Sequence, residues 1–152
     1  MLATFEVRDA EPADYEHVFD LYGALFREHI EQIWGWDEAW QIANFAEEWR
    51  TARTRVIVVE GRIAGYIQLK LEADHSYLLS LGIAPTSQGG GIGRRIMEDL
   101  MGETVRRGVP LRLSVFRTNP RALKFYEVLG FQVTEATAEF HRLEWRQVSP
   151  HS

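Results

Sequence analysis

The chain has 152 residues, 45% of them hydrophobic and none of them cysteine, so one domain can bury a core without disulfides, thiolate metal ligands or a cysteine nucleophile. Its net charge of −5 argues against nucleic acid as the main ligand, because nucleic-acid-binding domains usually present a basic face. The opening residues lack the apolar run of a signal peptide, and no apolar stretch is long enough for a membrane span, so we expect a cytoplasmic protein that does not bind membranes.

The predicted elements alternate between strands and helices, which favours a mixed sheet covered by helices. A strand over 4–8 is followed by a helix that Pro12 opens and by a second helix that Asp37 caps. Strands over 55–60 and 64–71 then form a predicted hairpin. Helical spacing predicts that the second helix buries Ile42, Phe45, Ala46 and Trp49.

The second half of the chain continues the alternation. It contains a strand over 77–83, a helix over 91–107, a strand over 111–116, a helix over 120–129 and two strands over 131–134 and 139–145. Gly130 stands where the last helix needs a left-handed residue to end.

These elements predict one domain over 1–149 with a short flexible tail over 150–152. We expect an α/β (α+β) fold, in which a largely antiparallel mixed and twisted sheet of about six or seven strands is flanked by about four helices. Edge strands near the C-terminus could pair with a second copy, so a homodimer is an open alternative.

The most informative stretch is a glycine-rich loop, in which an apolar strand ends near Ile83 and four glycines within five residues lead into a helix. Glycines permit positive backbone torsions and the close approach of a ligand. Successive amides can then form an anion-binding concavity, and the helix N-terminus adds unpaired N–H groups and partial positive charge. The pattern therefore predicts a phosphate-binding loop that needs no metal.

Two common nucleotide motifs do not fit this loop. A P-loop requires Gly-Lys-Ser/Thr at its end, whereas Gly93 is followed by Arg94 and Arg95. The dinucleotide fingerprint requires glycine or alanine three positions after its second glycine, where this chain has Ile96 or Arg94. A third class of phosphate loop is needed.

The pattern Gln/Arg-x-x-Gly-x-Gly does fit, filled by Gln88, Gly91 and Gly93. It resembles the pyrophosphate loop of the GNAT superfamily of acyl-CoA-dependent N-acyltransferases. A second segment, Asn119 to Phe131, is similar to the family's Asn-x-x-Ala-x-x-Phe-Tyr-x-x-x-Gly-Phe stretch, and the opening 7–14 resembles its first strand and helix. The resemblance covers nearly the whole chain and points toward uncharacterised bacterial members of the superfamily.

The resemblance implies a GNAT-like fold, in which two parallel strands splay apart and admit the pantetheine arm of coenzyme A. It implies acetyl-CoA as the co-substrate without a metal, and acetyl transfer to a primary amine by direct attack on the thioester. Main-chain contacts to pantetheine are implied for Leu81, Gly82 and Ile83. The residues implied to hold the pyrophosphate are Gln88, Gly89, Gly90, Gly91, Ile92 and Gly93, with Arg94 and Arg95 reaching outer phosphates or forming a solvated helix face.

The second segment carries the remaining implied donor-side roles. Asn119 and Ala122 would flank the pantetheine, and Asn119 can also cap the helix that begins at Pro120. Tyr126 matches the family's tyrosine and would protonate the leaving thiolate, because an ordinary phenol with a pKa near 10 keeps its proton at neutral pH. The alternative for Tyr126 is a core tyrosine.

The general base is less well marked. An alkylamine with a pKa of about 10.4 costs on the order of 4–5 kcal/mol to deprotonate at pH 7. Some family members carry a glutamate on the strand before the loop, but residues 77–83 contain no carboxylate. Glu28 and His29 are the first candidates, followed by Glu72 and His75, although such residues are more often surface residues than catalysts.

The acceptor side is predicted from a segment dense in aromatic and acidic residues, 34–41. Trp36, Gln41 and His29 would contact the acceptor, a small-molecule or peptide amine, since aromatic faces and carboxylates attract a cation. Alternatively the tryptophans pack the helix junction against the sheet. A non-catalytic acyl-CoA-binding module, acting as a sensor or interaction partner, is the competing function, because the strand lacks a carboxylate.

Overall fold

The computed structural model describes residues 4–147, so the predicted tail over 150–152 lies outside the described residues. The chain divides into two compact units. The first contains Met1–Lys70 and Leu79–Gly93, and the second contains Leu71–Leu78 and Arg94–Ser152. Strand β4 and helix α3 pass from one unit to the other, and β3 ends one residue inside the second unit.

The first unit is built on an antiparallel hairpin and two long helices. Its elements are β1 (Glu6–Asp9), the short 3-10 helix η1 (Pro12–Asp14), α1 (Tyr15–Ile33), α2 (Glu38–Thr51), β2 (Arg53–Val59) and β3 (Arg62–Leu71). β1 pairs with β2, and β2 pairs with β3, both antiparallel. The β2–β3 turn is tight because Glu60 and Gly61 both have positive φ, 50° and 77°, as the hairpin prediction requires.

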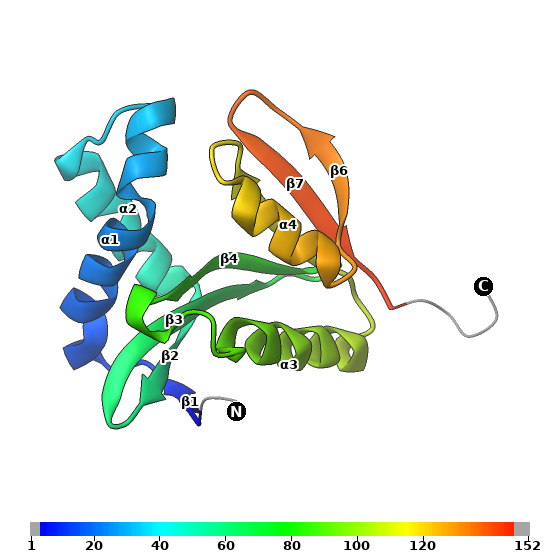
Figure 1. Cartoon of the computed structure of the whole chain (residues 1–152), viewed down its shortest axis with the longest axis horizontal. Helices are drawn as coiled ribbons and strands as arrows, with labels where there is room; N and C mark the ends of the chain where they lie inside the picture. The colour runs from blue at the N-terminus through cyan, green and yellow to red at the C-terminus, as the bar shows by residue number, and fades with distance from the viewer. Residues whose placement is uncertain (1–3, 148–152) are drawn as a thin grey trace. The chain divides into compact units, whose positions relative to one another are not determined.

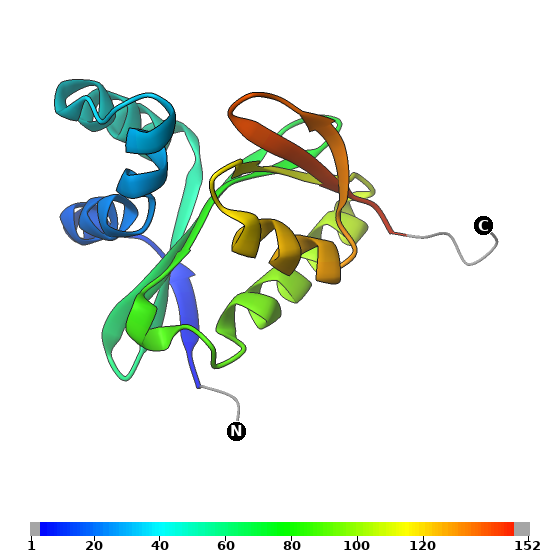
Figure 2. The same ribbon diagram turned by 45° about the horizontal axis from the view of Figure 1, so that its top comes forward.

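Helices α1 and α2 lie side by side (Figures 1 and 2) and bury an aromatic layer between them. Phe45 of α2 is 3% exposed, and its ring lies 5.0–5.5 Å from the rings of Phe19, Tyr22 and Tyr15 of α1. Asp37 caps α2 as predicted, since its carboxylate accepts a hydrogen bond from the Trp40 amide at 3.0 Å.

One expectation about α2 is wrong. Ile42 and Ala46 were expected on the buried face, but both are exposed, and Ile42 keeps 48% of its surface. Gln41 occupies the buried face instead and is only 4% exposed, because the Tyr22 hydroxyl donates a hydrogen bond to its Oε1 at 2.8 Å. A polar side chain with a partner can therefore replace the apolar residue that the spacing predicts.

The second unit combines two helices with the C-terminal strands of the chain. Its elements are the start of β4 (Ser76–Ile83), most of α3 (Ile92–Arg107), β5 (Leu111–Phe116), α4 (Pro120–Val128), β6 (Gln132–Ala136) and β7 (Phe140–Trp145). β7 pairs antiparallel with β5 and with β6. Leu111, Leu113 and Val115 alternate along β5 and are all buried, so one face of this strand is covered.

The seven strands follow the order β1-β2-β3-β4-β5-β7-β6. Strands β4 and β5 pair in parallel, and their register joins Ser76 to Leu111 and Leu78 to Leu113. Both strands continue past this register, β4 to Ile83 and β5 to Phe116. The predicted α+β fold with a largely antiparallel mixed sheet and four α-helices is confirmed. Within residues 4–147, no helix is long and apolar enough to cross a membrane.

Candidate active site

The glycine loop is a tight structure rather than a flexible connection. After β4, a single 3-10 turn, η2 (Pro85–Ser87), leads to Gly89 and Gly91, whose φ angles are +85° and +84°. Only glycine adopts such torsions without strain. The Gln88 side chain donates a hydrogen bond from Nε2 to the carbonyl oxygen of Ile83 at 2.8 Å, which ties the loop back to the end of β4.

The loop opens directly into α3, which begins at Ile92. The first N–H groups of any helix lack intrahelical acceptors, and the helix dipole adds partial positive charge there. The first turn of α3 contains no acidic residue that would already occupy these donors, and the loop from 88 to 93 has no ionisable side chain. The stretch can therefore bind an anion through its backbone alone.

Gly82 shows why β4 needs a small residue before the loop. A Cβ atom at this position would lie 2.5 Å from Cε1 of Tyr66 and 2.8 Å from Cδ1 of Leu25, both too close for real contacts. Glycine lets the strand backbone lie directly on the fully buried Tyr66 ring. The main chain of Leu81, Gly82 and Ile83, the predicted pantetheine contacts, is thereby held in a fixed position.

The second segment, in the second unit, is fixed by its own caps. Asn119 accepts a hydrogen bond from the Ala122 amide at 3.1 Å, so its structural role as the cap of α4 is observed. Gly130 follows α4 with φ +106°, as predicted. Tyr126 packs edge-to-face against Phe125 and Phe131, with ring centroids 5.0 and 5.6 Å apart.

Burial raises the pKa of the Tyr126 phenol above its ordinary value, so the hydroxyl keeps its proton across the physiological range. Within the part of the chain that the structure describes, no hydrogen bond engages this hydroxyl. A protonated, unengaged phenol can donate to a ligand atom on which negative charge develops.

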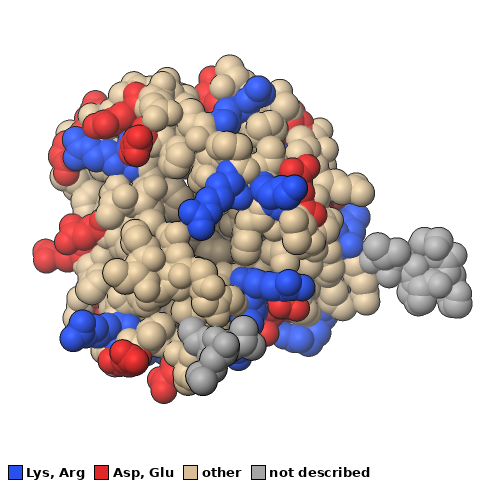
Figure 3. Space-filling model, in the orientation of Figure 1, with Lys and Arg blue, Asp and Glu red and all other residues tan. Residues whose placement is uncertain are grey.

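A hollow of about 250 Å³ lies between the start of α3 and α4. Phe125, Val128 and Leu129 give it an apolar lining, and Arg94 and Lys124 add positive charge. Figure 3 shows Lys and Arg side chains gathered over the surface of α3 and α4. Arg94 had been predicted as a phosphate contact, whereas Lys124 was missed, although its place two residues before Tyr126 in the second segment could have marked it.

The predicted acceptor residues lie at the junction of α1 and α2, in the first unit. Trp36 is half-buried, donates a hydrogen bond to Glu38 at 2.6 Å and lies under the Arg27 guanidinium, 5.0 Å from its ring centroid. Gln41 is engaged by Tyr22, as described above. All of these contacts join residues within the junction, so some of its polar side chains stabilise the packing of α1 against α2.

The two candidate bases of α1, Glu28 and His29, follow one another near its C-terminal end, where Glu28 is exposed and His29 is half-buried. The structure brings neither into a defined relation with Tyr126, which belongs to the other unit. The two alternative candidates, Glu72 and His75, lie in the turn before β4, where Asp74 pairs with the His75 ring nitrogen at 2.8 Å.

Comparison with known proteins identifies the family. Residues 15–131 match the family model described as the acetyltransferase (GNAT) family. The chain belongs to the GNAT acetyltransferase family. Its members are N-acetyltransferases that use acetyl-CoA and an amine acceptor, so the predicted enzyme class, EC 2.3.1.-, is confirmed, and the predicted family is confirmed with it.

Two curated GNAT relatives differ in what they act on. The [ribosomal protein bS18]-alanine N-acetyltransferase of Escherichia coli K12 is 32% identical over 113 residues, which cover 72% of this chain and 73% of the relative. The 5-NmdU N-acetyltransferase of Pseudomonas phage PaMx11 is 37% identical over 76 residues, covering 49% of this chain and 53% of the relative. Membership in the family therefore does not fix the acceptor.

A solved structure supports the fold. The PaiA N-acetyltransferase of Thermoplasma acidophilum, in complex with coenzyme A, superposes with a TM-score of 0.77 over 95% of this chain and 99% of its own. At 19% identity this similarity shows the shared fold.

Proposed function

We propose that the chain transfers an acetyl group from acetyl-CoA to the α-amine of a peptide or of a small molecule. The observation that carries the donor half is the loop in which Gly89 and Gly91 both adopt positive φ directly before α3. This geometry turns backbone amides toward one concavity at a helix N-terminus, as a pyrophosphate requires.

Donor binding would use separate parts of the chain for separate parts of coenzyme A. The loop from Gln88 to Gly93 holds the pyrophosphate, and the main chain of residues 81–83 pairs with pantetheine amides, much as an added strand would. Asn119 and Ala122 contact the pantetheine from the start of α4. The hollow beside Arg94 takes the phosphorylated adenosine end, because it combines an apolar lining with positive charge.

Turnover begins when the neutral amine attacks the thioester carbonyl and ends when the C–S bond breaks. Tyr126 donates its hydroxyl proton toward the departing sulfur, where negative charge develops. Its raised pKa ensures that the proton is present, and solvent restores the phenol after release. Glu28 or His29, acting through water, would accept protons from the incoming ammonium.

The acceptor class follows from the cost of making the amine neutral. An alkylamine needs on the order of 4–5 kcal/mol at pH 7, whereas an α-amine with a pKa near 7.7–8.0 needs only about 1 kcal/mol. Because β4 carries no carboxylate, an α-amine suits this chain better. The relative that acts on an alanine of ribosomal protein bS18 points in the same direction.

Contacts to the acceptor would come from the α1–α2 junction. Trp36 and His29 are half-buried and can present surface to a cation. Gln41 would act indirectly, by holding the Tyr22 hydroxyl in place.

A thiol-release assay tests the proposal directly. Purified protein and acetyl-CoA are mixed with a panel of amines that contains a peptide with a free α-amine, the same peptide with a blocked N-terminus and one free lysine, polyamines and amino acids. We expect free thiol with the unblocked peptide, and much less with the blocked peptide. Thiol release only with alkylamines would refute the α-amine assignment, and no release with any amine would refute the acyl transfer.

A further inference from the structure

A pair of hydroxyl groups lies where the parallel register between β4 and β5 ends. The Tyr77 hydroxyl and Ser114 Oγ are 2.8 Å apart, and both residues are half-buried. The last recorded partners in the register are Leu78 and Leu113, the immediate neighbours of Tyr77 and Ser114. The two strands are therefore linked side chain to side chain at the point where their backbone register stops.

This hydroxyl pair lies on the less buried face of β5. Side chains alternate along a strand, so Ser114 points away from the face of the buried Leu113 and Val115. α4, which carries Tyr126, contacts β5. The Tyr126 hydroxyl and the Tyr77–Ser114 pair therefore come from different elements of the same unit.

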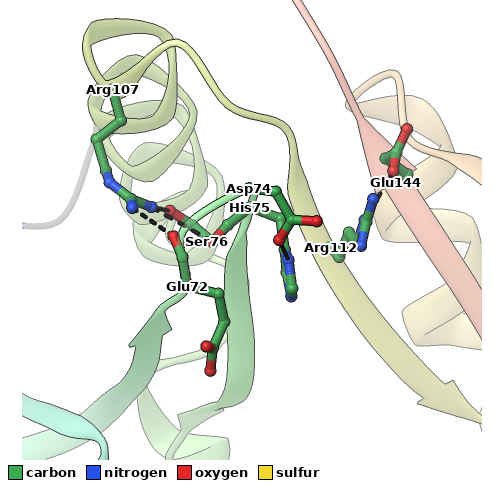
Figure 4. A network of polar contacts seen from close by, with 7 residues as sticks. All are labelled: Glu72, Asp74, His75, Ser76, Arg107, Arg112 and Glu144. Carbon is green, nitrogen blue, oxygen red and sulfur yellow. Dashed lines mark hydrogen bonds and ion pairs between the residues drawn. The ribbon is translucent and has the colours of Figure 1, made fainter.

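The surroundings hold both strands firmly. Figure 4 shows Arg107, at the end of α3, reaching the turn before β4, where it donates to Ser76 Oγ and to the Glu72 carbonyl oxygen, both at 2.6 Å. Arg112 on β5 pairs with Glu144 on β7 at 2.8 Å in the same view. Fixed strands on both sides keep the Tyr77 and Ser114 side chains in one geometry, as a site for a reacting group requires.

The chain contains a second pair of the same composition, which makes the contrast informative. Tyr66 and Ser80 are hydrogen-bonded at 2.7 Å in the first unit. The Tyr66 side chain is 0% exposed and belongs to a core cluster with Val18 and Phe45. The Tyr66 side chain is thus fully enclosed, whereas Tyr77 and Ser114 are both only half-buried.

We infer that the Tyr77–Ser114 pair contacts the neutral acceptor amine and takes the proton that its nitrogen loses as the C–N bond forms. The inference rests on the acyl transfer proposed above. A hydroxyl can both accept and donate a hydrogen bond. Ser114 Oγ therefore accepts a hydrogen bond from an N–H of the neutral amine, which orients the lone pair of the amine nitrogen toward the thioester.

Proton transfer along the pair balances without a charged residue. As the C–N bond forms, the nitrogen becomes acidic and passes its proton to Ser114 Oγ. Ser114 passes its own hydroxyl proton to Tyr77, and Tyr77 passes its own to water, so both hydroxyls end neutral. The C–S bond breaks as the sulfur takes its proton from Tyr126, and the products are an amide and a thiol.

Substitutions on either side of the hydrogen bond test the inference, with the best amine of the panel as acceptor. Tyr77→Phe and Ser114→Ala should each lower kcat at least about tenfold, and the double variant should fall no further, because the pair acts as a unit. The Kd for acetyl-CoA should stay within about twofold of the wild type. Ser114→Thr keeps the hydroxyl and should retain most of the rate.

Tyr15→Phe is the control, because Tyr15 packs against Phe45 and Trp49 in the first unit and has no assigned role in the site. It should leave kcat within about twofold. Folded Tyr77→Phe and Ser114→Ala proteins with unchanged kcat would overturn the inference and leave the acyl transfer standing. An equal loss in Ser114→Thr and Ser114→Ala would also overturn it. A wild-type protein that releases no thiol would overturn both.

Discussion

The glycine loop and the α1–α2 junction belong to the same unit, yet one depends on backbone groups and the other on side chains. The loop from Gln88 to Gly93 works through its backbone: two glycines have positive φ, and its one polar side chain is bonded to the Ile83 carbonyl oxygen. The junction works through side chains, with Trp36 between Arg27 and Glu38, and Gln41 bonded to Tyr22.

The difference explains why the donor is better defined than the acceptor. A backbone site needs glycines at fixed positions, so it leaves a recognisable pattern in the sequence. A side-chain site can be built from many residue types, and here the same types also pack a core. Substitutions should therefore separate the two regions: changes on the donor side should affect binding and turnover, and changes at the junction should affect folding.

The largest effect is expected at Tyr126, the proposed acid of the donor side. Tyr126→Phe keeps the ring contacts with Phe125 and Phe131 and removes only the hydroxyl. We expect kcat to fall about 100-fold or more, while the Kd for acetyl-CoA changes less than about twofold. Steady-state thiol release and calorimetric binding measure the two quantities.

Tyr15→Phe is the control for this change. Burial also raises the pKa of Tyr15, whose ring packs against Phe45 and Trp49 in the first unit. Its loss of a hydroxyl should leave kcat unchanged. Equal kcat values for Tyr126→Phe and the wild type would remove the assigned role of Tyr126.

A smaller effect, on stability, is expected at the junction. Tyr22→Phe leaves the buried Gln41 Oε1 without its donor, which should lower the free energy of unfolding by about 1–3 kcal/mol. Adding Gln41→Leu removes the unpaired atom and should recover part of the loss. Urea denaturation of the single and double variants measures the coupling.

The comparison would break if these junction variants, still folded at the assay temperature, changed the KM for the amine more than they changed stability. In that case Gln41 would contact the acceptor, as the sequence prediction has it. An unchanged KM would leave Gln41 as a buried support of α1 and α2.

Sequence patterns predicted the elements well because their ends carry strong local chemistry. Asp37, Asn119 and Gly130 cap or end helices as expected, and β5 spans the predicted residues 111–116. The prediction of which α2 residues are buried is wrong, because helical spacing and hydrophobicity favour burial of Ile42 over Gln41. Only the partner, Tyr22 on another helix, decides which of them is buried.

The candidate site shows the same difference between residues with a local sequence signal and residues whose role depends on a distant partner. Residues tied to the loop were found because glycine torsions leave a local signature. Ser114 was not, since its hydroxyl acquires meaning only beside Tyr77, 37 positions earlier in the sequence and adjacent through strand pairing. Lys124 was likewise missed because its hollow is formed with Arg94 from a different helix.

Two glycines at opposite ends of α3 allow the loop itself to be tested. Gly91 and Gly108 have φ of +84° and +73°, so alanine at either position should cost about 1–2 kcal/mol of stability through strain. Only Gly91→Ala should also weaken acetyl-CoA binding, by about tenfold, since it alters the anion-binding amides. Thermal melts with and without acetyl-CoA separate the two effects. Equal weakening by Gly108→Ala would mean that the loop has no special part in binding.

The smallest effect is on stability at acid pH and comes from Asp14, directly before α1. Asp14 accepts hydrogen bonds from Arg8 at 2.8 Å and from the Glu11 amide at 2.7 Å. The Arg8 hydrogen bond holds the pKa of the Asp14 carboxyl below its ordinary value of 3.8, despite the opposing effect of burial. The unfolded chain therefore binds this proton first, so the stabilisation is complete above pH 3.8 and is lost as the pH falls through the lowered pKa.

Asp14→Asn should cost less than about 1 kcal/mol at neutral pH and should flatten the loss of stability in acid, measured by denaturation at roughly pH 2–5. Asp9→Asn is the control, because Asp9 forms only an exposed ion pair with Arg53 at 3.3 Å and should leave the acid slope unchanged. An Asp14→Asn protein with the wild-type acid slope would contradict the assignment. The loop from 88 to 93 has no ionisable side chain. Acid should therefore weaken the region around Asp14, which depends on a charged side chain, before it weakens the loop.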